Sequence, residues 1–485
     1  MNHYNDATLV LPLDVSKLVA VDFQGGDLTS DAGFLLLTQA DRKAGVTAAL
    51  ASTLRDGRQR GKVSHTLQEL VRGRVLSIAA GYADANDMDT LRQDPALKVA
   101  VGRCPLSEEA LASQPTLSRF ENSVTKRELL SAGLALAERV IAQLPDNTKS
   151  VVLDIDATDD PCHGQQEFEG FNAYYDSHCY MPLLMHLTDE QGQQWPLAAL
   201  LRPGQTNPLA GVVGLLSRAV AMLRARWPGV EILVRGDSGF GSDKVLRCCD
   251  RLGVRFLLGL PTNSRVKTLG LPTQLRCQAA YDAAQAKAAE AKAKAAKAKT
   301  KATEAATGRA SAGDGDHRRY GRFLYKAGSW PWRRDTVIKV AMTQGKLNPR
   351  YVVTNLKRWR GKALNAESIY ELYCGRGDQE NRIKELKLDL ESGRTSCHRF
   401  LANQMRLLQH LAAHILWTVV RAAAAGTRWT QARVATLQLQ VLKVAARVRE
   451  STRRVWLHLC TAYPYQDDWR LLLHRLTPCT QAPPS

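Results

Sequence analysis

Short apolar runs and longer helical patterns alternate along residues 148–262. The short runs are rich in Val, Leu and Ile, as buried strands are, whereas the longer stretches repeat their apolar residues with helical spacing. We expect a strand at residues 151–156, a two-stranded hairpin at 181–201 that turns at 189–192, and a helix at 209–226. A strand at 230–237, a helix at 242–252 and a strand at 254–260 should follow. This order predicts an α/β domain built on one sheet.

Residues 1–147 are predicted to be mostly helical after a short extended start. Their clearest apolar stripe has helical spacing and comprises Leu67, Leu70, Val71, Val75, Ile78 and Tyr82. Further along, Pro115 stands just before a helix start at Thr116, and this helix would carry Ser118 and Arg119. The spacing fits a helix-turn-helix reader of DNA and a plain helical bundle equally well.

Residues 263–362 interrupt this alternation and are predicted to form an insertion. Its first part, residues 278–307, repeats Ala and Lys and cannot bury a core, which leaves a single exposed helix or a disordered basic arm. Its second part contains two strand-like runs, TVIKVAMT and RYVVTNL. A helix is expected within residues 363–394, and residues 395–485 are expected to be helical to the end and are a candidate dimerisation region.

The charge of the chain indicates a polyanionic partner. The 485 residues carry a formal net charge of +19, and cations that neutralise phosphates release counterions from nucleic acid. A membrane surface is the competing partner, but no apolar stretch of about 20 residues exists. The first ten residues lack the pattern of a signal peptide, and the ten cysteines lack framework spacing. We therefore expect a cytoplasmic protein with reduced thiols and no membrane partner.

Residues 373–387, YCGRGDQENRIKELK, carry the most unusual constellation of side chains. If this stretch is a helix, Tyr373, Arg376, Glu380 and Lys387 share an arc of about 60°. Apolar residues border this arc, so the polar line would be partly desolvated. By itself the spacing favours an ordinary amphipathic helix with an ion pair between Arg376 and Glu380. Gly375 and Gly377 within the stretch predict an irregular helix start.

Two carboxylates upstream change this interpretation. Asp156 ends the apolar run SVVLDID, and Asp237 ends the run VEILVRGD. Residues at the carboxyl ends of buried strands point into the crevice where α/β proteins place their active sites. Together with Glu380, they make three acids from distant parts of a strongly basic chain.

The chain resembles the DDE insertion-sequence transposases, whose helix bears the spacing Tyr-x2-Arg-x3-Glu-x6-Lys, at every one of these four positions. Within that family it is similar to the insertion sequence thirteen-eighty branch, because LDIDAT, FNAYYDSHCYMPLL, LRPGQTNP, RGDSGFGS and RYVVTNL occur in the expected order. The resemblance covers about residues 20–425. It implies an RNase H-like catalytic core interrupted by a β-rich insertion, with helical N-terminal and C-terminal regions.

The resemblance also implies domain roles and a reaction. Residues 1–147 would bind DNA ends, 148–262 would begin the catalytic core, 263–362 would be the insertion, 363–394 the closing catalytic helix, and 395–485 the C-terminal region. The enzyme would nick the ends of an insertion sequence by hydrolysis and transfer the freed 3′-hydroxyl groups to target DNA. Its partners would be double-stranded DNA at the element ends and the target, and a second copy in a synaptic homodimer. Its location would be a prokaryotic cytoplasm, at the nucleoid when it is bound to DNA.

Three clustered carboxylates repel one another, and divalent cations remove that cost. We expect Asp156, Asp237 and Glu380 to share two Mg²⁺ ions, with Mn²⁺ as a substitute, because Mg²⁺ prefers oxygen ligands. Asp154 would point to the same strand face as Asp156, so it stays an alternative for the first ligand. Relatives place this acid two residues before a threonine, which favours Asp156.

The remaining candidate residues would contact DNA. Tyr373, Arg376 and Lys387 can bind the phosphate backbone. Trp330 and Trp332 lie in the insertion, where some relatives use an aromatic residue to stabilise a flipped base, although packing under the sheet is the favoured alternative for both.

Other functions on the same fold remain alternatives. An RNase H-like nuclease or resolvase would cut without strand transfer, and a non-catalytic derivative would only bind DNA. The complete set of acids and the Tyr-Arg-Glu-Lys spacing favour a transposase.

Overall fold

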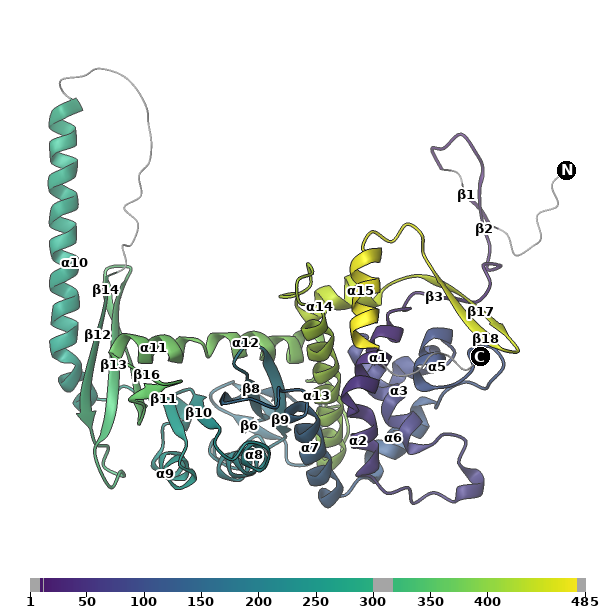
Figure 1. Ribbon diagram of the computed structural model, residues 1–485, viewed down its shortest axis with the longest axis horizontal. Helices are drawn as coiled ribbons and strands as arrows, with labels where there is room; N and C mark the ends of the chain where they lie inside the picture. Colours follow the sequence, from purple (N-terminus) through teal and green to yellow (C-terminus); the bar gives the residue numbers. More distant parts are fainter. Residues whose placement is uncertain (1–8, 12, 300–316, 478–485) are drawn as a thin grey trace. The chain divides into compact units, whose positions relative to one another are not determined.

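The computed structural model describes all residues except 1–8, 12, 300–316 and 478–485 (Figure 1). Two compact units share the chain. Unit 1 comprises Met1–Gln143, Asp160–Tyr180 and Ile383–Ser485, and unit 2 comprises Leu144–Asp159 and Met181–Arg382. Both units are therefore assembled from segments that are far apart in the sequence.

Unit 2 is built on an eight-stranded mixed sheet. Five of its strands lie where the sequence predicted them: β4 (Ser150–Ala157), β8 (Leu183–Thr188), β9 (Gln194–Leu200), β10 (Glu231–Gly236) and β11 (Arg255–Leu260). Their spatial order is β9-β8-β4-β10-β11. The first three strands run antiparallel to their neighbours, whereas β4, β10 and β11 are parallel.

The strands of the expected insertion extend this same sheet. They are β12 (Arg318–Tyr325), which the sequence did not predict, β13 (Arg334–Thr343) and β14 (Lys346–Thr354). β14 pairs antiparallel with β11, and β13 and β12 continue the sheet outward. Buried Leu257 from the first part and Val352 from the second lie in one hydrophobic cluster. The insertion therefore shares its core with the preceding strands.

The helices of unit 2 lie where the sequence predicted or allowed a helix, except that the helix of the Ala/Lys repeat begins earlier, at Ser264, where none was predicted. They are α8 (Val212–Arg226), α9 (Asp243–Leu252), α10 (Ser264–Lys299), α11 (Ala366–Cys374) and α12 (Gly377–Lys384). The first part of α10 packs on β12 and β13, where Cys277 is fully buried. No residue from 278 to 294 is buried, and Figure 1 shows this part of the helix projecting past the sheet. The Ala/Lys repeat is thus helical as far as Lys299 and exposed as far as residue 294, and residues 300–307 of that repeat lie outside the described part of the chain.

Unit 1 is mainly helical. Its N-terminal segment forms α1 (Phe34–Ala44), α2 (Val46–Ser52), α3 (Leu67–Ala79), α4 (Met88–Leu91), α5 (Pro95–Val101), α6 (Gln114–Ser123) and α7 (Lys126–Ile141). The long helix α13 (Phe400–Ala423) packs against several of them and is buried almost throughout. Over the ranges that the structure describes, no helix is long and apolar enough to cross a bilayer.

The prediction that the chain is helical from residue 395 to its end is wrong for one segment. After α14 (Val434–Leu437), two strands, β17 (Ala446–Ser451) and β18 (Arg454–Leu459), form a hairpin, and α15 (Gln466–Leu476) follows. β17 also pairs with β3 (Leu28–Thr29), so the hairpin belongs to a three-stranded sheet. β17 alternates arginine with apolar residues at a period of two, which is the pattern of a half-buried strand.

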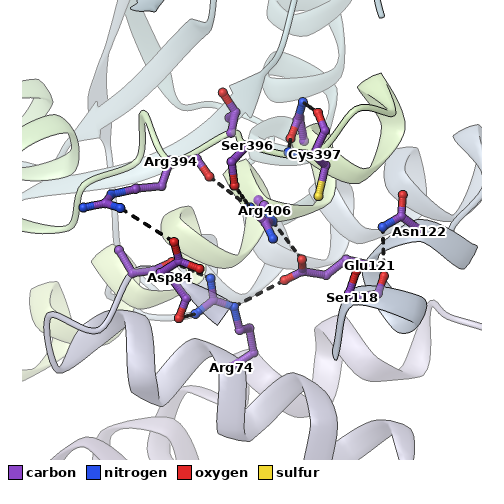
Figure 2. Close-up of polar contacts among 12 residues, drawn as sticks. Arg74, Asp84, Ser118, Glu121, Asn122, Arg394, Ser396, Cys397 and Arg406 are labelled. Carbon is purple, nitrogen blue, oxygen red and sulfur yellow. Dashed lines mark hydrogen bonds and ion pairs between the residues drawn. The ribbon is translucent and has the colours of Figure 1, made fainter. Parts of the chain in front are cut away.

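A buried ion network ties three helices of unit 1 together (Figure 2). Glu121 of α6 accepts a hydrogen bond from Arg74 of α3 at 3.3 Å and another from Arg406 of α13 at 2.8 Å. Arg74 and Glu121 are fully buried, and Arg406 is 5% exposed. Arg74 also donates to the backbone carbonyls of Tyr82, Ala83 and Asp84. Each charged group in this network therefore has several polar partners.

Candidate active site

Two of the predicted acids lie at the ends of neighbouring strands. Asp156 is near the end of β4, and Asp237 directly follows β10. Because β4 and β10 are adjacent and parallel, their carboxyl ends meet at one edge of the sheet. One Asp237 carboxylate oxygen accepts the backbone N–H of Gly239 at 2.9 Å, which holds the side chain at the start of a short 3-10 turn.

The expected helix over residues 373–387 is broken rather than continuous. Tyr373 lies in the last turn of α11, Gly375 ends that helix, and Glu380 lies in the first turn of α12. A π-helical turn, Glu385–Asp389, follows α12 and contains Lys387. The break falls where the glycines predicted an irregular start, and it places Arg376 between the two helices.

Arg376 links the acids of the strand and the helix. Its Nη1 atom lies 3.0 Å from Asp156 Oδ2, and its Nη2 atom lies 2.8 Å from Glu380 Oε1. Burial raises the pKa of Asp156 to about 6; the negative charges of Asp237 and Glu380 act in the same direction, and Arg376 opposes them. The site thus concentrates more negative charge than its single arginine balances.

Tyr373 also faces this site, because its environment includes Arg376, Asp237 and Asp156. Burial raises the pKa of the Tyr373 hydroxyl, so this group stays protonated at neutral pH and can donate a hydrogen bond. The structure therefore brings together Tyr373, Arg376, Asp156, Asp237 and Glu380. Lys387 belongs to unit 1, in the π-helical turn that follows α12.

A second arginine–carboxylate pair lies beneath the site. Arg235 binds Asp154 through two hydrogen bonds of 2.7 Å, and both side chains are almost fully buried. Arg235 also donates to the carbonyls of Leu372 at 2.6 Å and Gly375 at 3.3 Å, at the end of α11. This pair therefore connects the two central strands to the helix break that carries Arg376.

The close approach of Arg235 explains the glycine at the break. A Cβ atom on Gly375 would lie 2.5 Å from Arg235 Nη1, so the guanidinium would have to shift, whereas a Cβ atom on Gly377 would meet nothing within 4 Å. Sequence reasoning missed Arg235. The signal was present, because Arg235 precedes Asp237 by the same two positions by which Asp154 precedes Asp156.

The donor chemistry of the site suits a hard divalent cation. Asp156, Asp237 and Glu380 offer only carboxylate oxygens, and their mutual repulsion gives a cation a favourable place. As the side chains are placed, no group of three His, Cys, Asp or Glu within the described ranges is arranged to hold a metal ion. Arg376 instead supplies the positive charge between Asp156 and Glu380.

The other predicted DNA contacts are on other elements than the acids. Ser118 and Arg119 are on α6 of unit 1, where Ser118 is partly buried and Arg119 is exposed. In unit 2, Trp330 is 4% exposed and packs on Tyr325, so it is a core residue as placed. Trp332 is 50% exposed and lines a cleft with four residues of α9, which are Lys244, Arg247, Arg251 and the acid Asp250.

Carboxylates from two parallel strand ends and a neighbouring helix, linked by an arginine, define a candidate site for phosphodiester chemistry. The chain belongs to the family described as transposase DDE domain group 1, whose model matches residues 11–481. A comparison with curated proteins gives no match. Membership of this family makes the protein a DDE-type transposase and implies that it binds DNA.

Proposed function

We propose that this transposase binds the ends of an insertion sequence, cleaves them with Asp156, Asp237 and Glu380, and joins the freed 3′-hydroxyl groups to target DNA. The observation that carries the proposal is the convergence of the three acids. Asp156 and Asp237 end adjacent parallel strands, and Arg376 connects Asp156 to Glu380 on the following helix.

The topology of the sheet supports an RNase H-like core. Three antiparallel strands followed by two parallel ones, in the order β9-β8-β4-β10-β11, form the arrangement expected for it. The thirteen-eighty branch rests on the ordered motifs in the sequence, of which LDIDAT contains Asp156 and RGDSGFGS contains Asp237.

Asp156, rather than Asp154, is proposed as the first acid. Asp154 is fully buried and holds Arg235 with both carboxylate oxygens, which leaves it no role at the surface of the site. Asp156 is 14% exposed and lies near both other acids.

Asp156, Asp237 and Glu380 would hold two Mg²⁺ ions, for which Mn²⁺ would substitute. Bound there, the ions would activate the attacking oxygen and stabilise the leaving oxygen. Arg376, released from its carboxylates, would bind the DNA backbone through its planar guanidinium, and Tyr373 would donate a hydrogen bond beside it. Lys387, Ser118 and Arg119 are proposed as further DNA contacts.

Trp332 is the better of the two tryptophan candidates for stacking on a displaced base. Its exposed ring lies 4.9 Å from the guanidinium of Arg334 and beside the cations of α9, whereas Trp330 is covered by Tyr325. A synaptic homodimer, with residues 395–485 at its interface, completes the proposal.

The test is to incubate the purified protein with a labelled end of its own element, target DNA and Mg²⁺, and to sequence the products. Joined 3′ ends would support transposition. Cleavage without joining would favour the alternative, an RNase H-like nuclease or resolvase, and binding without cleavage would favour a non-catalytic derivative. A protein that neither binds nor cuts would contradict the proposal.

A further inference from the structure

One face of the C-terminal hairpin carries cations and aromatic rings. In the register of β17 and β18, Arg447 lies opposite His458, Arg449 opposite Trp456, and Ser451 opposite Arg454. Cross-strand partners point to the same side of a sheet, so these six residues share one face. All six are exposed. We call this face the arginine ribbon.

The opposite face anchors the hairpin to the rest of unit 1. Ala446 and Val448 are buried there. Glu450 accepts hydrogen bonds from the backbone N–H groups of Leu106 at 2.7 Å and Ser107 at 3.2 Å. The hairpin that carries the arginine ribbon is therefore fixed to the rest of unit 1, and its acid, Glu450, lies on the opposite face.

The positive charge of the arginine ribbon is not balanced. Among the residues that the structure describes, no carboxylate forms an ion pair with Arg447, Arg449 or Arg454, or with Arg453 in the turn between the strands. Many other surface arginines of unit 1 do have such a partner, including Arg428, Arg433 and Arg470. An exposed face with one sign of charge is typical of a surface that meets a polyanion.

The aromatic rings extend this surface along β18. Trp456 is 50% exposed, its ring is parallel to that of His458 at 5.9 Å, and the guanidinium of Arg454 lies 5.9 Å from it. Tryptophan and arginine are the residues that binding surfaces favour over the rest of the protein surface. The half-exposed tryptophan ring therefore indicates that this face is a binding surface and not an ordinary solvated face.

We propose that the arginine ribbon is a binding surface for the backbone of double-stranded DNA. The inference depends on the proposed function in one respect, which is that the protein acts on DNA. It adds a DNA contact that involves neither the three acids nor α6. A six-residue strand spans about 20 Å, and a two-stranded ribbon fits the major groove of duplex DNA. Within residues 395–485, the ribbon itself is assigned to DNA and not to the homodimer interface, because each copy carries a net charge of +19 and two such faces would repel each other.

The experiment compares two double variants that remove equal charge from unit 1. Arg449→Ala with Arg454→Ala alters the arginine ribbon, and Lys126→Ala with Arg127→Ala alters exposed residues at the start of α7. Fluorescence anisotropy with a labelled duplex of arbitrary sequence is recorded over a range of salt concentrations. The ribbon variant should bind at least about tenfold more weakly, and its affinity should depend less steeply on salt, because about two fewer counterions are released on binding. The α7 variant should bind like the wild type.

Trp456→Ala is a third variant and should weaken duplex binding without changing the melting temperature, because the side chain is half exposed. Equal losses in the ribbon and α7 variants would mean that only net charge matters and would overturn the inference. So would unchanged duplex affinity accompanied by a smaller oligomer in sedimentation, which would assign the ribbon to a second copy. A loss confined to single-stranded DNA would overturn the choice of duplex.

The failure of this inference differs from the failure of the proposed function. If the ribbon variant binds duplex DNA normally while the wild type cleaves element ends, only the ribbon assignment is wrong. If the wild type neither binds nor cleaves DNA, the proposed function is wrong as well.

Discussion

Each unit contains a cluster of arginine and carboxylate groups, and the two clusters are balanced in opposite ways. In unit 1, Glu121 lies between Arg74 and Arg406, and each of its oxygens accepts one of the two arginines. In unit 2, Arg376 reaches Asp156 and Glu380, while Asp237 adds a third negative charge. The cluster in unit 1 has two arginines around one acid that accepts a hydrogen bond from each, whereas the cluster in unit 2 has three acids around one arginine.

This difference separates stability from function. A buried acid whose partners are all in place stabilises the fold, because its removal leaves buried cations without a counter-charge. An ionised acid placed among other acids lowers the free energy of unfolding. Such a cluster is typical of a functional site, where a bound cation offsets the repulsion. The same substitution, carboxylate to amide, should therefore have opposite effects on stability in the two clusters.

The largest expected effect is on catalysis in unit 2. Asp156→Asn, Asp237→Asn and Glu380→Gln should each reduce cleavage of element ends by a thousandfold or more, on the order of the several kcal/mol that metal ligands contribute to a transition state. Binding to the ends should remain, since α6 and the arginine ribbon are unchanged. Cleavage rates and anisotropy measure the two properties. Normal cleavage by Asp156→Asn, combined with loss in Asp154→Asn, would reverse the assignment of the first acid.

The next effect is on the stability of unit 1. Glu121→Gln should lower the free energy of unfolding by about 3–5 kcal/mol, because Arg74 and Arg406 would stay buried without their carboxylate. Urea unfolding measures the change. A variant as stable as the wild type would show that backbone carbonyls alone satisfy both arginines.

Asp156→Asn should instead stabilise the metal-free protein. Burial raises the pKa of Asp156 from its ordinary value of 3.8 to about 6, so the native state binds the proton more tightly than the unfolded state and wild-type stability falls as pH rises from about 4 to 6. The neutral amide avoids this loss, which amounts to roughly 2–3 kcal/mol. Urea unfolding without Mg²⁺ should show a more stable variant at pH 7.5 and little difference at pH 4. A less stable variant at pH 7.5 would mean that the ion pair with Arg376 outweighs burial.

A smaller effect should appear at the helix break. Gly375→Ala places a Cβ atom 2.5 Å from Arg235 Nη1 and should cost about 1–3 kcal/mol of stability, together with part of the cleavage rate, because Arg376 follows directly. Gly377→Ala is the matched control, since its Cβ atom meets nothing within 4 Å and alanine favours a helix. Thermal melts and cleavage rates compare the pair. Equal behaviour of the two variants would contradict the positioning role of Arg235.

The smallest effect on stability should follow deletion of residues 278–307. The described part of this segment has no buried residue before residue 295, so the melting temperature should hardly change. Non-specific DNA affinity should fall, and its salt dependence should become shallower. A large drop in melting temperature would show that the segment packs against the fold.

The sequence predicted those parts of the fold whose pattern is local. The five strands of residues 148–262 and helices α8 and α9 lie within a few residues of their expected positions, since apolar periodicity reflects the face that each element buries. β12 escaped prediction because only one of its eight residues is buried and its sequence, RRYGRFLY, lacks a clean apolar run. β17 and β18 were missed because the surrounding chain is helical and the hairpin is short.

The candidate site was predictable in part for the same reason. Asp156 and Asp237 end apolar runs, so the sequence alone indicated that they lie at strand ends. Neither the pairing of Asp154 with Arg235 nor the carbonyl contacts at the end of α11 could be predicted, because they depend on how two distant segments pack. The burial of Trp330 against Tyr325 depends on tertiary packing in the same way.

The most direct test of the central claim is to locate the metal by the cuts that it makes in the protein. Fe²⁺ replaces Mg²⁺, and with ascorbate and peroxide it generates radicals that cleave the backbone close to the ion; mass spectrometry then identifies the fragments. The account predicts cuts near Asp156, Asp237 and Glu380, suppressed by excess Mg²⁺ and by Asp156→Asn. Cuts confined to other regions, or cuts near the acids that persist in Asp156→Asn, would contradict a shared metal site at these three residues.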